Sequence, residues 1–153
     1  MSIVFDCDPF PSSLRLRGSA EVTHELIAEV LRACRRIPLL GRDDRTARLP
    51  RLIEMEAWTE ATLLLIELEV PFWQIRRIIH DDGEWHCSLS RARELPDWLD
   101  DSVQGRHQEL ALALLCALAE AQAAGAAIAK PSPALLQGRS DPPSTPVCCD
   151  NFR

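Results

Sequence analysis

The residues best suited to chemistry are His80, Glu84 and His86, which flank an Asp-Asp-Gly turn. Two imidazoles and a carboxylate are ligands that Zn²⁺ and other divalent ions accept. In an antiparallel hairpin, His80 can lie opposite Glu84 and diagonal to His86, so that the three converge on the outer face. The solvent face of such a sheet requires the same polar residue types, and no fourth ligand is evident. The sequence therefore predicts no catalytic, cofactor or metal site, with these three residues as the candidates if an ion binds.

The cysteines divide between apolar segments and the two ends of the chain: Cys7, Cys34, Cys87, Cys116, Cys148 and Cys149. Cys87 follows His86 directly, but successive strand residues point to opposite faces, so the two cannot form a thiolate–imidazole pair. Cys34, Cys87 and Cys116 have the apolar neighbours of small core residues. The adjacent thiols at 148 and 149 could bind a metal or oxidise, but nothing around them would activate a thiol, so we interpret them as tail residues.

Arginines recur at every third position of one polar segment: Arg42, Arg45, Arg48 and Arg51. Such a strip could bind phosphate. Asp43 and Asp44 partly neutralise it, and no aromatic residue interleaves it. We interpret the segment as a solvated connector and keep a nucleic-acid-associated regulator using Arg42–Arg51 as an alternative function.

The tryptophans supply half of the aromatic residues, since the chain has four Trp, four Phe and no Tyr. Trp58, Trp73 and Trp85 are expected in the core, where a helix crosses the hairpin. Trp98, which lies close to Pro96, could instead be a surface anchor for a partner.

A β-hairpin is predicted over residues 72–90, turning at Asp81-Asp82-Gly83, and parity sets its register. Trp73, Ile75 and Ile79 of the first strand occupy odd positions, as do Trp85, Cys87 and Leu89 of the second. A three-residue loop pairs His80 with Glu84 and Ile79 with Trp85, which places these apolar residues on one face. A two-residue Asp82-Gly83 loop would set odd residues opposite even ones, so we predict the longer loop. Arg77 then faces the core opposite Cys87, where it needs a carboxylate partner.

The other elements follow from apolar periodicity and from proline and glycine positions. We predict an irregular lead-in over 1–18, a helix from an N-cap at Ser19 to about Arg36, a polar connector over 41–50 and a helix over 51–69. Residues 91–107 are predicted as a loop with one helical turn, although 102–107 could be a third strand or the start of the next helix. An Ala/Leu-rich helix follows over 107–127, and the Pro/Ser-rich tail over 130–153 is predicted to be disordered. The fold class is α+β: one domain over 19–129, with three main helices packed on a small antiparallel hairpin sheet.

The net charge of −6 is concentrated in the middle of the chain, where residues 52–129 carry fourteen acidic and five basic groups. An acidic surface repels phosphate backbones and anionic lipids, which disfavours nucleic-acid and membrane partners. No secretory leader opens the chain, and no apolar run reaches the roughly 20 residues of a membrane span, so a cytoplasmic location with mostly reduced cysteines is expected. Sixteen arginines against the single Lys130 indicate a GC-rich bacterial genome.

The span 56–121 carries three motifs: Glu56-Ala57-Trp58, Gly83-Glu84-Trp85-His86-Cys87 and the run LALALL from Leu110 to Leu115. By these it resembles small α-β sandwich proteins of bacteria and phages, in which a Trp-bearing helix leads into a hairpin and then an Ala/Leu-rich helix. The segment 91–107 and the additional N-terminal helix depart from that pattern. The family has no assigned activity, so the resemblance implies the fold alone.

Enzyme signatures such as G-x-S-x-G, the P-loop and H-E-x-x-H are absent from the sequence, which favours a protein that is not an enzyme. A two-stranded hairpin leaves both edges unpaired, so a third strand, a second copy or a partner must cover it. The apolar helix surfaces at 63–68 and 110–118 offer an interface. We predict a non-enzymatic interaction protein or accessory subunit that self-associates or binds a protein partner. The alternatives are the regulator above and a small metal-dependent enzyme at the hairpin's outer face.

Overall fold

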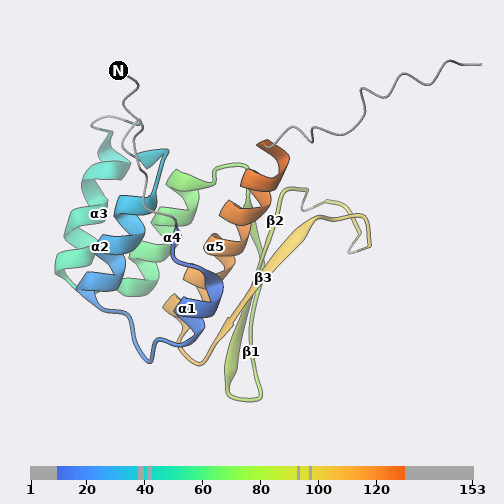
Figure 1. Cartoon of the computed structure of the whole chain (residues 1–153), viewed down its shortest axis with the longest axis horizontal. Coiled ribbons are helices and arrows are strands. Elements are labelled where there is room, and N and C mark those ends of the chain that lie inside the picture. Colours follow the sequence, from blue (N-terminus) through green and yellow to red (C-terminus); the bar gives the residue numbers. More distant parts are fainter. Residues whose placement is uncertain (1–9, 38–39, 41–42, 93, 97, 130–153) are drawn as a thin grey trace, which may run out of the picture.

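The computed structural model describes residues 10–129 except 38–39, 41–42, 93 and 97 (Figure 1). The predictions for residues 1–9 and for the tail, including Cys7, Cys148 and Cys149, lie outside the described residues, as does Arg42. The fold is α+β, as predicted, and the described residues form five helices and a three-stranded antiparallel sheet of order β1-β2-β3. In chain order the elements are α1 (Ser13–Arg17), α2 (His24–Ala33), α3 (Asp44–Glu54), α4 (Trp58–Glu69), β1 (Gln74–Asp81), β2 (Glu84–Ser90), β3 (Ser102–His107) and α5 (Leu110–Ala129).

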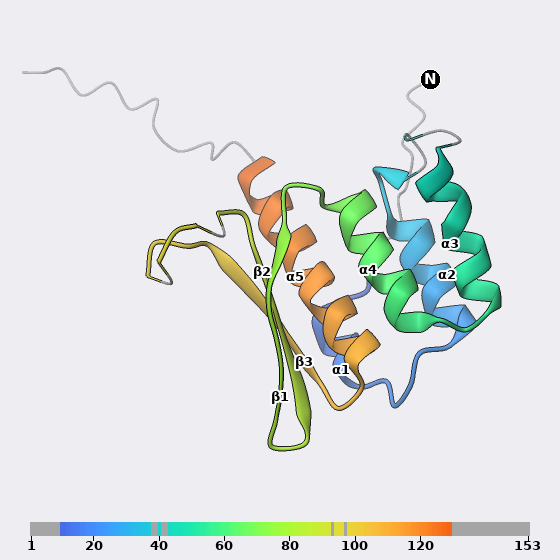
Figure 2. The ribbon, with the colours of Figure 1, turned by 180° about the vertical axis from the view of Figure 1, so that it is seen from behind.

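Helix α5 lies at the centre of the molecule, with the sheet on one side and the other main helices on the other (Figures 1 and 2). Because it is covered on both sides, every residue from Ala111 to Ala119 is at most 7% exposed. The helix is therefore apolar all round its first half rather than on one face. Among the described residues, no helix has the combination of length and apolar character that crossing a membrane requires.

The N-terminal helices differ from the prediction at their ends. Helix α2 is capped by Thr23, whose Oγ1 accepts a hydrogen bond from the Leu26 amide, so Ser19 is not its cap. The Ser19 carbonyl instead accepts a hydrogen bond from the His107 ring, whose Nδ1 accepts from the Glu109 amide. The predicted irregular lead-in also contains a helical turn, α1. This turn places Leu16 fully inside the core.

The single helix predicted over 51–69 is two helices, and most of the predicted connector belongs to the first of them. Asp43 and Thr46 form a capping box that starts α3 before Pro50, so this proline lies inside the helix, where it removes one backbone hydrogen bond. Helix α3 ends at Glu54, and Glu56 adopts a positive φ of 55° before α4 begins. The apolar periodicity of the sequence did not reveal this break, because both helices carry apolar stripes.

The hairpin forms where it was predicted, but with the two-residue turn. Asp82 and Gly83 have φ of 49° and 80°, the signs that a type I′ turn requires. His80 therefore pairs with Trp85 and Ile79 with His86, so the predicted register is wrong at this end. Ile75 still pairs with Leu89, as predicted.

A β-bulge accounts for both results. The register shifts between Ile75 and Arg77, where Arg76 is the extra residue of β1. One extra residue reverses the parity of the strand, which removes the objection that odd residues would face even ones. Arg77 consequently pairs with Ser88 and is exposed, so it needs no buried partner.

The third strand at 102–107 is confirmed, and the preferred loop prediction is wrong for these residues. β3 pairs antiparallel with β2, placing Gly105 opposite Cys87 and directly against α5. A Cβ added at Gly105 would lie 2.1 Å from the Ala113 carbonyl oxygen and 2.4 Å from the Ala117 nitrogen. Glycine at this position allows the helix and sheet backbones to approach so closely.

Candidate functional site

The three candidate ligands do not come together. His80 shares a face of the sheet with Trp85, whereas Glu84 and His86 belong to the opposite face, because neighbouring strand positions alternate. The His80 ring packs on the Trp85 ring, with centroids 4.8 Å apart. Within the described part of the chain, no three His, Cys, Asp or Glu residues are placed to hold a metal ion. The outer-face metal-dependent enzyme thus loses the geometry on which it was based.

The three described core cysteines lie where the sequence placed them. Cys34, Cys87 and Cys116 are buried free thiols. Burial raises the pKa of Cys34 to about 12, with the negative charge of Glu69 adding to the effect. Burial likewise raises the pKa of Cys87 and of Cys116 to about 11. These thiols remain protonated near neutral pH and are poor nucleophiles.

The described arginines of the predicted strip lie on α3. Arg45, Arg48 and Arg51 are all exposed, and their three-residue spacing gathers them on one side of the helix. The same helix carries Asp44 and Glu54, each one turn from one of these arginines. The strip is therefore a surface of mixed charge on a helix rather than on a connector.

The edge of the sheet at β1 is open in the described structure. β1 pairs with β2, and the turn of this hairpin extends beyond the N-terminal end of α5 (Figures 1 and 2). Ile78 and Ile79, on opposite faces of this strand, are 38% and 41% exposed. A strand edge with exposed isoleucines is a surface on which another strand can pair.

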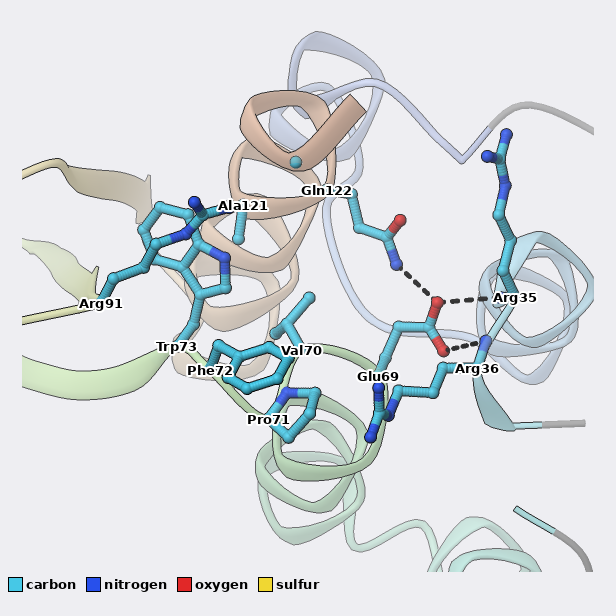
Figure 3. Close-up of a pocket in the computed structure, with 11 residues that line it drawn as sticks. Arg35, Arg36, Glu69, Val70, Pro71, Phe72, Trp73, Arg91, Ala121 and Gln122 are labelled. Atoms are coloured by element: carbon cyan, nitrogen blue, oxygen red, sulfur yellow. Dashed lines mark hydrogen bonds between the residues drawn. The ribbon is translucent and has the colours of Figure 1, made fainter. Parts of the chain in front are cut away.

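A pocket of about 650 Å³ lies between the end of α2, the turn from α4 into β1 and the C-terminal half of α5 (Figure 3). We call it the α4–β1 pocket. Its charged and polar lining comprises Arg35, Arg36, Glu69, Arg91 and Gln122, and Val70, Pro71, Phe72 and Trp73 supply most of the apolar lining. Nothing in the sequence pattern united these residues, because they come from four separate segments.

Among the described residues that line the α4–β1 pocket, Glu69 is the only acidic one, and its carboxylate is fully engaged. It accepts hydrogen bonds from the backbone amides of Arg35, Arg36 and Ile37, at 2.8, 3.0 and 3.2 Å. The side-chain amide of Gln122 donates a fourth, at 2.9 Å. Glu69, only 7% exposed, thus joins the segment after α2 to α4 and α5 and is structural rather than reactive.

No family model, curated protein or solved structure matches the chain. The resemblance to small α-β sandwich proteins therefore stays a prediction, and function must be argued from the geometry.

Proposed function

We propose that this chain is a non-enzymatic interaction protein of the bacterial cytoplasm that self-associates by pairing β1 with β1 of a second copy. The observation that supports this best is the open β1 edge with its two exposed isoleucines. The three buried free thiols suit a reducing compartment.

We place the interface at the sheet edge instead of on the apolar helix surfaces that the sequence suggested. The apolar surfaces of α4 and α5 lie inside the chain, where Leu65, Leu114 and Leu118 are fully buried. Packing within the chain covers most of these apolar side chains, although Leu63 and Leu110 are only partly buried. The described sheet has two edge strands, β1 and β3, and of these β1 carries the large exposed apolar side chains, Ile78 and Ile79.

Hydrogen-bond parity restricts how two copies of β1 can pair. In a hairpin with a two-residue turn, the flanking residues Asp81 and Glu84 bond to each other, so the backbone groups of Asp81 and Ile79 point toward β2. Those of Ile78 and His80 then point to the free edge. An antiparallel pairing of two β1 strands must therefore match even positions with even and odd with odd.

Charge selects one of the allowed registers. With the twofold axis at Ile79, this residue meets the partner's Ile79, and Arg77 faces Asp81 of the partner subunit on the outer face, twice per dimer. Ile78 then lies beside the partner's His80 on the inner face. Opposite charges directly across an antiparallel pair stabilise it, and the two isoleucines cover each other. The result is a six-stranded sheet across the dimer.

Analytical ultracentrifugation from about 1 to 200 µM tests the proposal, since a dimer's population must rise with concentration. We expect Arg77→Asp or Asp81→Arg alone to weaken the dimer roughly tenfold, because each creates like-charge pairs at both sites. The double variant Arg77→Asp/Asp81→Arg should restore it. Arg106→Asp, an exposed arginine of β3, is the matched control and should have no effect.

A monomer at every concentration would refute self-association. A dimer that resists all three variants of Arg77 and Asp81 would refute this register while leaving self-association intact. Thermal melting followed by circular dichroism, run on each variant, separates loss of pairing from loss of fold.

A further inference from the structure

The α4–β1 pocket is a second surface with chemistry of its own, independent of the β1 edge. Three arginines, Arg35, Arg36 and Arg91, are among its described lining residues, against the one carboxylate of Glu69, and in Figure 3 the Arg35 side chain points away from Glu69. That carboxylate already accepts four hydrogen bonds. The pocket therefore holds an excess of positive charge and of hydrogen-bond donors.

Within the described part of the chain, Arg35, Arg36 and Arg91 have no anionic partner. Arg91 lies over the Trp73 ring, 4.7 Å from its centroid, a contact that orients the guanidinium plane and leaves its edge N–H groups able to donate. An arginine edge presents paired donors that fit a carboxylate or a phosphate.

Apolar surface separates the charged groups. In Figure 3, Phe72 and Pro71 lie between Arg91 on one side and Arg36 on the other. The Phe72 side chain is 76% exposed, so its ring is open to a ligand. A bare inorganic ion would leave this surface unused. A ligand with an apolar body would cover it.

We propose that the α4–β1 pocket binds a small organic anion, with a carboxylate or phosphate held by Arg36 and its neighbours and an aromatic or aliphatic body lying on Phe72. The volume of about 650 Å³ lies within the range usual for small-molecule sites. Gly125 of α5 also lines the pocket, and no atom lies within 4 Å of where its Cβ would be. The wall is open there, so the pocket can admit a body of ring size.

Isothermal titration of the full chain with 2-naphthoate tests the proposal, with the neutral 2-naphthalenemethanol and inorganic phosphate as comparison probes. We expect 2-naphthoate to bind with a Kd below about 1 mM, and each comparison probe at least roughly tenfold more weakly. The variant Arg35→Gln/Arg36→Gln should weaken 2-naphthoate roughly tenfold, since it removes charge-assisted hydrogen bonds. It keeps the backbone amides that bind Glu69, so the fold should persist.

Arg48→Gln, an exposed arginine of α3, is the matched control and should bind like the parent chain. Phe72→Ser should weaken 2-naphthoate and leave the response to phosphate unchanged. Equal binding of the acid and the alcohol would overturn the anion site. No binding of 2-naphthoate, or an equal loss in Arg48→Gln, would overturn it as well.

Discussion

At the scale of single residues, two residues have structural roles that their residue types alone do not indicate. Glu69 appears in the sequence as one more glutamate of an apolar helix, yet its carboxylate satisfies three consecutive backbone amides after α2. Gly105 lies in a segment that the sequence favoured as a loop, yet it allows the close approach of β3 to the central helix. Periodicity could find neither role, because each depends on a segment distant in sequence.

We predict that Gly105→Ala lowers the free energy of unfolding by about 3 kcal/mol, because the new methyl group would overlap backbone atoms of α5 that cannot move independently. Urea titration followed by tryptophan fluorescence measures the change. Gly125→Ala, in α5 itself, is the control, and its Cβ would meet no atom within 4 Å apart from the nearby backbone of its own helix. It should be neutral or stabilising by up to about 1 kcal/mol, since alanine is the better helix residue. Equal stability of Gly105→Ala and the parent chain would contradict the close approach.

At the scale of elements, the bulge in β1 is the feature that the parity argument missed. It presents Arg76 to the loop between β2 and β3, where its guanidinium bonds to the Asp100 carboxylate and to the Leu95 carbonyl. Asp100 also accepts a hydrogen bond of 2.7 Å from Ser90. The bulged residue thus ties the loop to the sheet.

The bond from Ser90 holds the pKa of Asp100 below its ordinary value of 3.8, and Arg76 contributes to the same shift. A depressed native pKa stabilises the fold above the unfolded pKa and loses that contribution as pH falls through the native pKa. We therefore expect Asp100→Asn to flatten the loss of stability between about pH 4 and pH 2, measured by urea unfolding at each pH.

The same Asp100→Asn substitution should speed amide hydrogen exchange in the described part of the loop by roughly tenfold, since an amide forms a weaker bond with Arg76. Asp101→Asn, the exposed neighbour, is the control. If both variants lose stability at low pH as the parent chain does, and exchange their amides at the parent rate, the hydrogen bonds of Asp100 with Arg76 and Ser90 do not hold the loop.

At the scale of the whole molecule, α5 packs against the sheet on one side and against the other main helices on the other. The three buried thiols lie in the core around it. Cys87 lies in the sheet, Cys116 in α5 and Cys34 at the end of α2, each at most 4% exposed. Burial raises all three thiol pKa values, to about 11, 11 and 12, from an ordinary value of 9.0. The native state therefore keeps protons that the unfolded chain loses in alkaline solution.

A raised native pKa contributes stability that is present below the unfolded pKa and is lost as pH rises through the native one. We expect the free energy of unfolding to fall as pH rises from about 9 toward 11, with a smaller slope in Cys34→Ala. Urea titrations at each pH measure it. At pH 8, a thiol reagent should modify these cysteines only as fast as the chain opens. A stability that does not change over this pH range would contradict the role of buried thiols.

The sequence by itself determined the α+β class, the hairpin and its glycine, the third-strand alternative and the burial of the core cysteines. These depend on local conformation and on alternation within single segments, as Gly83 with its positive φ and Cys87 in its strand illustrate. It also predicted an interface on the apolar helix surfaces at 63–68 and 110–118, most of whose apolar residues are buried in the core.

Only the tertiary structure decided the register, the central position of α5, the open β1 edge and the α4–β1 pocket. The bulge at Arg76 reverses the parity of β1, and Arg76 bonds to Asp100, which lies 24 residues further along the chain. Similarly, the apolar faces that suggested an interface became core because the sheet and the other helices cover α5 from both sides. Such outcomes depend on contacts between distant segments, and no periodicity within one segment carries that information.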